Sequence, residues 1–190
     1  MRRTTATIAA IALAFGSMML VSCGSNELIR SDPSGGLNGG FELMEDGYPV
    51  NWAFGPDPES TESYRVSVDT ERFVEGSNSL CVISSKADPT KAFRSKRVPV
   101  QAGAEYRISF SMMNEGCSLR VRRTTMNSSG TKNMREGIIA TVSESSSDWV
   151  SHEEILTAAQ GEAKVFLTFL IDGVGTLWCD DVRIEEHTSE

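Results

Sequence analysis

The stretch TLWCDDVRIEE, residues 176–186, lies near the end of the chain and decides how the rest is interpreted. Its apolar and β-branched residues predict a strand whose alternation turns Leu177 and Cys179 toward a core and Trp178 away from it. Asp180 and Asp181 interrupt this pattern. Aspartate is a poor strand former, and adjacent carboxylates repel each other. We therefore expect these two acids to have a structural or functional role that offsets their cost in a strand.

Alternation of apolar and polar residues recurs along the chain, whereas helical periodicity is nearly absent. Turn-forming segments such as VEGSN (74–78) and NSSGT (127–131) separate the alternating runs. Strands are predicted at 63–68, 79–84, 105–112, 117–124, 137–142, 149–155, 164–171 and 176–184. Many short strands punctuated in this way predict an all-β domain, a β-sandwich or jelly roll, over residues 37–187.

Two of these strands also predict which side chains form the core, because successive strand residues point to opposite faces. Core positions are expected at Tyr106, Ile108, Phe110, Met112, Val165, Leu167, Phe169 and Ile171. Outward positions are expected at Arg107, Ser109, Ser111, Met113, Lys164, Phe166, Thr168 and Leu170.

The first 22 residues have the pattern of a signal peptide, with two arginines followed by an uncharged apolar run. The run ends in LVSC, residues 20–23, which resembles the lipobox of bacterial lipoproteins and implies lipidation of Cys23 after cleavage. A plain transmembrane anchor is the alternative, but the apolar run is short for one. Residues 23–36 are rich in Gly and Ser and predict a flexible tether. The expected location is the cell envelope, on the outer membrane.

Charge argues against some partners. Cleavage removes two of the 18 basic residues and none of the 26 acidic ones, which leaves 16 against 26 and a net charge of −10. This balance disfavours nucleic acid or an anionic membrane surface as the main partner. The acidic net charge is compatible with a globular domain that is held near a membrane by its lipid.

Three cysteines follow Cys23, namely Cys81, Cys117 and Cys179, so at most one disulfide forms among them. An exported protein permits that bond. The chain has no CxxC spacing, which argues against a zinc site. The simpler interpretation is that all three are small apolar strand residues.

Six segments occur in a particular order: LNGGFE (37–42), DGYPVNW (46–52), VEGSNSLCV (74–82), AGAEYRISFSM (102–112), SSDWVSHEEI (146–155) and GTLWCDDVRIE (175–185). In this order the chain resembles carbohydrate-binding modules of the family 4, 9 and 22 type, which are galactose-binding-like jelly rolls. The resemblance covers nearly the whole domain. It implies a non-catalytic module with polysaccharide or oligosaccharide as its partner, working beside glycan-processing proteins.

The resemblance also implies a structural calcium ion where the first and last strands meet. Carried over by position, its ligands are Gly40, Glu42, Glu75, Asn78 and Asp180. Calcium binds carboxylate and carbonyl oxygens, so this donor set fits its chemistry. The alternative is that these acids are simply solvated. Asp181 has three open interpretations: a second ligand, a cap for a backbone group, or a solvent-facing residue.

A sugar site in such modules combines an aromatic platform with polar side chains. The outward candidates are Phe166, Arg120, Arg122, Ser111 and Met113. Phe166 is the best stacking platform, and the two arginines suit hydroxyls or a uronate carboxylate. Ser111 stands where the family often has an aromatic residue. Trp52 and Trp149 are assigned to packing, whereas Trp178 is expected either on the surface or beneath the N-terminal segment.

Evidence for catalysis is thin. HEEIL, residues 152–156, is not HExxH, and Glu153 and Glu154 are adjacent on a strand and therefore face opposite ways. The sequence therefore predicts a lipid-anchored glycan-binding module without enzymatic activity. The second hypothesis is a structural or protein-interaction lipoprotein that keeps the jelly roll and has no sugar site.

Overall fold

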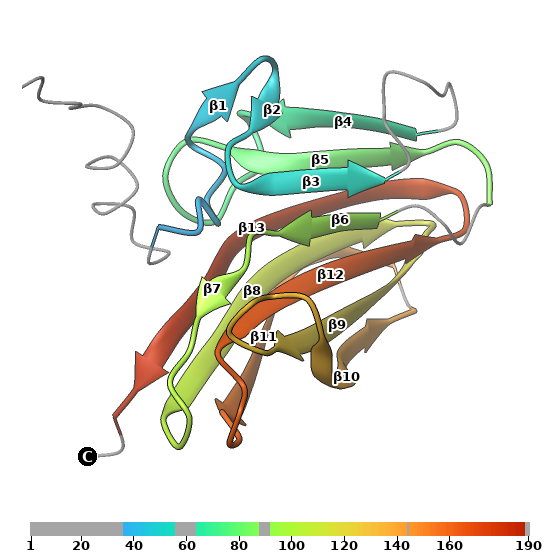
Figure 1. Cartoon of the computed structure of the whole chain (residues 1–190). Coiled ribbons are helices and arrows are strands. Elements are labelled where there is room, and N and C mark those ends of the chain that lie inside the picture. The colour runs from blue at the N-terminus through green and yellow to red at the C-terminus, as the bar shows by residue number, and fades with distance from the viewer. Residues whose placement is uncertain (1–35, 56–63, 88–91, 144, 189–190) are drawn as a thin grey trace, which may run out of the picture.

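A computed structural model describes residues 36–55, 64–87, 92–143 and 145–188 (Figure 1). Antiparallel strands form two sheets that pack face to face. The six-stranded sheet has the order β10-β9-β12-β6-β3, with β7 paired to β12, and the five-stranded sheet has the order β11-β8-β13-β5-β4. A separate pair, β1 and β2, precedes them. The predicted all-β sandwich is confirmed, and its topology is that of a jelly roll.

The strands differ widely in length. The six-stranded sheet contains β3 (Trp52–Gly55), β6 (Ala92–Ser95), β7 (Val98–Pro99), β9 (Ser118–Met126), β10 (Asn133–Val142) and β12 (Lys164–Asp172). The five-stranded sheet contains β4 (Tyr64–Asp69), β5 (Ser79–Ser84), β8 (Glu105–Glu115), β11 (Ser146–Thr157) and β13 (Gly175–His187). The pair is β1 (Met44–Glu45) and β2 (Tyr48–Pro49).

All eight predicted strands are present, mostly longer than predicted. Five short strands, β1, β2, β3, β6 and β7, were not predicted. They contain two to four residues each, which is too few for alternation to be recognised. The omission matters because β3 and β6 form one side of the six-stranded sheet.

The core lies between the two sheets, and the face assignments of β8 and β12 are confirmed. Every predicted core residue of these strands is buried, none more than 8% exposed. Phe93 of β6 stacks on Phe169 of β12 with ring centroids 4.5 Å apart. Trp52 joins this cluster, 5.8 Å from Phe93, so its assignment to packing is also confirmed. Burial of these rings supplies much of the favourable free energy of folding.

The LNGGFE segment joins the start of the domain to its closing strand. Asn38 is buried and adopts a φ of 57°. Its side chain donates to the carbonyls of Leu43 and Val50 and accepts from the Leu43 N–H, at 2.8 to 2.9 Å. The Val182 N–H donates to the Gly39 carbonyl at 3.1 Å. Leu37 and Phe41 on either side are fully buried. This segment therefore packs as part of the sandwich.

A second apolar cluster lies on the outer face of the five-stranded sheet. It contains Trp178, Met113 and Cys81, with Trp149 packed against them, so Trp149 packs outside the main core. The Arg72 guanidinium lies 4.5 Å above the Trp178 ring, and Trp178 Nε1 donates to Asp69 at 2.8 Å. Trp178 is therefore covered by the segment that follows β4.

The three cysteines, Cys81, Cys117 and Cys179, are separate, buried free thiols, which supports their interpretation as small strand residues. The predicted signal peptide, Cys23 and nearly all of the tether lie outside the described residues. Within the described part of the chain, no helix has the length and apolarity needed to cross a membrane.

Candidate functional site

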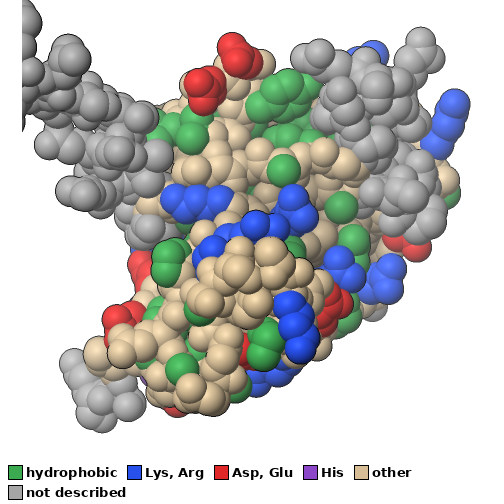
Figure 2. Space-filling model, viewed as in Figure 1, with side chains coloured by type: hydrophobic (Ala, Val, Ile, Leu, Met, Phe, Trp, Pro, Cys, Tyr) green, Lys and Arg blue, Asp and Glu red, His purple; other side chains and the backbone are tan. Residues whose placement is uncertain are grey.

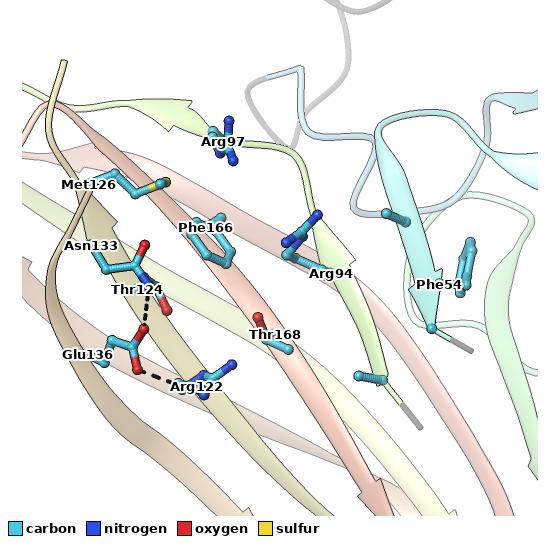
Figure 3. A pocket seen from close by; sticks show the side chains of 13 residues that line it. Phe54, Arg94, Arg97, Arg122, Thr124, Met126, Asn133, Glu136, Phe166 and Thr168 are labelled. Carbon is cyan, nitrogen blue, oxygen red and sulfur yellow. Dashed lines mark hydrogen bonds and ion pairs between the residues drawn. The ribbon is translucent and has the colours of Figure 1, made fainter. Parts of the chain in front are cut away.

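A sandwich has two outer faces, and the six-stranded sheet is hollowed on its outer face. Figure 2 shows this face from the side used in Figure 1, with Lys and Arg side chains gathered across its middle. The hollow has a volume of about 420 Å³. Its lining includes Phe54, Arg94, Arg97, Arg122, Thr124, Asn133, Glu136, Phe166 and Thr168 (Figure 3).

Strand register places these side chains in two rows across the sheet. Thr168 of β12 is paired with Arg94 of β6 on one side and with Arg122 of β9 on the other. Two residues earlier on β12, Phe166 is paired with Thr124, which is paired in turn with Glu136 of β10. Directly opposed residues of neighbouring strands project from the same face. The pairing therefore brings residues that are far apart in sequence into one pocket.

Phe166 forms an apolar wall of the pocket. Its side chain is only 7% exposed, less than expected for an outward phenylalanine. The Arg94 guanidinium lies over its ring, 5.5 Å from the centroid (Figure 3). The ring and the guanidinium together make a platform on which a flat apolar surface can stack.

Three buried polar atoms of this pocket have no hydrogen-bond partner among the described residues. They are Arg122 Nε, Thr124 Oγ1 and Thr168 Oγ1. Thr124 is fully buried and Thr168 is 6% exposed. A buried polar group without a partner costs about 1–3 kcal/mol. Neighbouring protein atoms cover all three, so a ligand would contact them only if the lining side chains shifted.

Glu136 lies beside one of these groups. Its Oε1 accepts from Asn133 Nδ2 at 2.7 Å, and its Oε2 lies 3.8 Å from Arg122 Nη1 (Figure 3). Arg122 is thus paired at one nitrogen while its Nε remains without a partner. This ion pair is long and partly exposed, so it restrains the guanidinium only weakly.

The predicted ligand residues do not form one site. Phe166 and Arg122 line the pocket, and Arg120 is exposed on the same face of β9 outside its lining. Ser111 and Met113 lie on β8, in the other sheet, and both are buried. Ser111 Oγ is 2.9 Å from Ser151 Oγ, and Met113 packs in the Trp178 cluster. Grouping them with Phe166 was wrong, because outward residues of the two sheets point in opposite directions.

The predicted metal residues occupy a different place, around the turn at residues 74–78. Glu42 Oε1 accepts from the N–H groups of Ser77 and Asn78 at 2.6 and 3.0 Å. Asp180 Oδ2 accepts from the N–H groups of Val74 and Glu75 at 2.6 and 3.1 Å. The two carboxylates therefore hold the same turn from opposite ends of the chain, which gives Asp180 a structural role.

Gly40 lies between these carboxylates. A Cβ built on it would lie 3.8 Å from Glu42 Cγ and 3.9 Å from Asp180 Oδ1. Glu75, by contrast, directs its carboxylate to Arg183, which also pairs with Asp181. Among the described residues, no three His, Cys, Asp or Glu side chains converge as a metal site needs. The oxygens of Glu42 and Asp180 accept from N–H groups, and the carboxylate of Glu75 pairs with Arg183, so a cation would have to compete with these partners.

Asp180 has an unusual environment. Its side chain is fully buried, and burial raises the pKa of its carboxyl from 3.8 to about 6. Hydrogen bonds from the N–H groups of Val74, Glu75 and Asp181 lower this pKa, and the neighbouring Asp181 charge raises it. Asp181 itself adopts a φ of 52° in the bulge that interrupts the pairing of β13 with β8. A bound cation would favour the ionised form of Asp180.

Several pocket residues were not predicted, namely Arg94, Arg97, Thr124, Asn133 and Glu136. Arg94 lies in the short strand β6 and Arg97 follows it. Thr124 could have been predicted, because the alternation of residues 117–124 places it on the same face as Arg122. The others join the site only through strand pairing, which the sequence does not specify.

Searches with the sequence found no matching family model and no matching curated protein. Solved structures, however, resemble the fold. One is the structure of xylanase 10B from Clostridium thermocellum, which contains a family 22 carbohydrate-binding module and a GH10 module complexed with xylohexaose. It superposes with a TM-score of 0.54 at 15% identity. The xylan-binding family 22 module of Paenibacillus barcinonensis xylanase 10C has a TM-score of 0.53 at 16% identity. The enzymatically active domain of bacteriophage CBA120 tailspike protein 4 has a TM-score of 0.58 at 14% identity.

Coverage differs among these structures. The similarity covers 72%, 75% and 79% of this chain for the xylanase 10B, xylanase 10C and tailspike structures. It spans 96% of the xylanase 10C module, but only 26% of the xylanase 10B chain and 21% of the tailspike chain. At these identities the similarity establishes a shared fold, that of carbohydrate-binding jelly rolls. Function has to be argued from the pocket.

Proposed function

We propose that this protein is a glycan-binding module whose site is the pocket on the six-stranded sheet. The observation that carries the proposal is the hollow itself, in which the ring of Phe166 lies beside the polar side chains of Arg122, Thr124 and Thr168. A sugar ring combines an apolar face with hydroxyls that donate and accept. It matches both parts of this lining. The xylan-binding neighbours make the same class of ligand plausible for this fold.

The pocket binds and does not catalyse in this proposal. Glycoside hydrolysis needs two carboxyl groups on either side of the scissile bond. Among the described residues of the pocket lining, Glu136 is the one carboxylate, and it is engaged with Asn133 and Arg122. We therefore expect the protein to position or retain polysaccharide for partner proteins that process it.

Screening tests the proposal. The protein is run in native affinity gels containing xylan, β-glucan, pectin or alginate, and probed on an array of oligosaccharides. Retardation by at least one polysaccharide is the expected result. If the folded protein binds no glycan in either format, the pocket has another use and the structural or protein-interaction alternative takes its place.

Two conservative variants give a sharper prediction. In Thr124→Val and Thr168→Val a methyl group replaces a buried hydroxyl of similar size. Removing a hydroxyl that lacks a partner should raise the free energy of unfolding by about 1 kcal/mol. Ser111→Ala on the other sheet is the control and should lower it, since the Ser111 hydroxyl bonds to Ser151. Lower stability in both threonine variants would show that these hydroxyls already have partners.

Calcium binding at the turn is a second proposal, at Glu42 and Asp180 with the carbonyls of Gly40 and Asn78. Its support is the burial of Asp180 beside Glu42 and Gly40. Calcium would contribute a charge that favours two ionised carboxylates and link the first and last parts of the domain. Glu75, the remaining predicted ligand, would first have to leave Arg183.

Melting curves test this site. Calcium should raise the Tm by about 3–6 °C, because it binds only the folded state. Asp180→Asn should abolish the response, and Glu75→Gln should keep most of it. With EDTA present, the raised pKa of Asp180 means that the folded state binds its proton more tightly than the unfolded state does. Stability should therefore fall as the pH rises from about 4 to about 6.

The pH also changes the calcium response in a defined direction. Protons compete with calcium for Asp180 below its pKa of about 6, so the calcium-dependent rise in Tm should shrink between pH 7 and pH 5. Asp148→Asn, an exposed acid on β11, should leave both pH profiles unchanged. A chelator-insensitive Tm at pH 7 would exclude the proposed metal site.

Lipid anchoring to the outer membrane is also proposed, from the LVSC sequence alone. Acylation at Cys23 should place the mature N-terminus there and hold the protein in the membrane fraction. Mass spectrometry of the N-terminal peptide checks this. An unmodified Cys23 in a protein that remains soluble would contradict it.

A further inference from the structure

The pocket continues into a second hollow on the same face. This hollow has a volume of about 390 Å³ and is lined by Asn51, Trp52, Ala53, Arg94, Ser95, Lys96 and Arg97. Ala53, Arg94 and Arg97 line both hollows. Arg94 and Arg97 therefore stand where the two meet, and a ligand longer than one sugar unit would pass between them.

The charge of this combined groove is opposite to that of the chain. Its described lining contains four cations, Arg94, Lys96, Arg97 and Arg122, and one acid, Glu136. Lys164 Nζ and Arg97 Nη1 also lie close together, 3.3 and 3.4 Å from a Cβ built on Gly130. The whole sequence has a net charge of −8. Figure 2 shows the cations gathered on this face. A local positive field on an acidic protein selects for an anionic ligand.

The two central arginines have no acidic partner among the described residues. Arg122, Arg123, Arg135 and Arg183 each have a carboxylate within 4.0 Å. No described carboxylate lies within that distance of Arg94 or Arg97, and Arg94 instead lies over the Phe166 ring. A guanidinium presents paired N–H donors that match a carboxylate or sulfate. Arg94 thus lies beside Phe166 with no counter-charge from the part of the chain that the structure describes.

We propose that the saccharide bound in this groove is anionic, and that Arg94 and Arg97 bind its carboxylate or sulfate while the sugar ring packs on Phe166. The inference rests on the proposed glycan function and names the chemical class of its ligand. Neutral glycans would leave both guanidinium groups facing the ligand without a counter-charge, so they should bind more weakly.

Matched ligands separate charge from shape. Oligomers of galacturonic acid and of chondroitin are compared with their methyl esters, which keep the sugar chain and remove the carboxylate charge. Chondroitin sulfate against chondroitin tests the sulfate. Affinities are measured by calorimetry at about 150 mM salt, where exposed charges are screened beyond about 8 Å. We expect at least one ligand to bind about tenfold more tightly than the partner that lacks its carboxylate or sulfate charge.

The variants Arg94→Gln and Arg97→Gln should remove this preference, so that charged and uncharged ligands bind equally, while the Tm stays nearly unchanged. Arg65→Gln, an exposed arginine on the five-stranded sheet, is the matched control. Equal binding of charged and uncharged partners by the unchanged protein would overturn the inference and leave the proposed function standing. Single-stranded DNA bound as tightly as the acidic sugars would also overturn it. A protein that binds none of these glycans, nor any in the wider screen, would refute the proposed function itself.

Discussion

Gly39→Ala should destabilise the domain severely. A Cβ on Gly39 would lie 1.8 Å from the carbonyl oxygen of Val182 and 2.7 Å from its carbonyl carbon. Both atoms belong to the backbone of β13, which is buried at this point, so the clash cannot be relieved by a side-chain rotation. The Val182 N–H also donates to Gly39, which fixes the two segments at close range. We expect a loss of at least about 4 kcal/mol, a large fraction of a typical domain's stability.

The neighbouring glycine provides the control. In Gly40→Ala the nearest atoms to the new methyl group lie at 3.8 and 3.9 Å, which is ordinary contact, and the carbonyl is retained. Its cost should stay within about 1 kcal/mol. Urea denaturation followed by the fluorescence of the buried Trp52 and Trp178 measures both variants. Equal midpoints would mean that residues 37–41 do not pack against the closing strand.

Phe166→Ala should weaken glycan binding by about 30-fold or more, the effect of removing an aromatic side chain from the centre of a binding site. The sugar would lose its stacking surface, and Arg94 would lose the ring that orients it. Phe166→Tyr should retain most of the affinity, because the π-face is kept. Phe166→Leu should lose binding while keeping apolar volume, which separates stacking from simple burial.

Phe73→Ala is the matched control for this experiment, since Phe73 is 41% exposed and lies between β4 and β5, at the five-stranded sheet. Its affinity should equal that of the unchanged protein. Calorimetry with the best ligand from the screen measures the four variants and the unchanged protein, and melting curves establish that each is folded. Unchanged affinity in a folded Phe166→Ala protein would exclude this pocket as the binding site.

The fold was largely predictable because alternation is a local property. Alternation is present in the eight longer strands, and it also identified the buried faces of β8 and β12. Strands of two to four residues contain too little pattern, which is why β3 and β6 were missed. The LNGGFE segment was recognised as important, but its buried Asn38 and its contact with Val182 appear only in three dimensions.

The site was predictable only in part, for a reason of geometry. Alternation shows that Phe166, Arg122, Ser111 and Met113 point outward, but a sandwich has two outer faces and alternation does not say which is which. Phe166 and Arg122 share one face because β12 pairs with β9, whereas Ser111 lies on β8 in the other sheet. Arg94 enters the site because β6 pairs with the other edge of β12. Pairing partners of this kind are set by the whole chain.

The partners of the acids in the closing strand could not be predicted from the sequence either. The resemblance implied that Asp180 and Glu42 share a calcium ion, whereas each carboxylate accepts from backbone N–H groups of the turn at residues 74–78. Asp181 pairs with Arg183, and so does Glu75. The sequence offered no sign that an arginine two residues away would take both partners.

The most direct test of the central claim is a map of backbone amide shifts in the ¹⁵N-labelled protein during titration with the best-bound oligosaccharide. If the glycan site is the pocket on the six-stranded sheet, saturable shifts should centre on Arg94, Thr124, Phe166 and Thr168. The amides of Ser111, Met113 and Ser151 on the opposite sheet should stay unchanged. Shifts centred on that opposite face, with the pocket unaffected, would contradict the account.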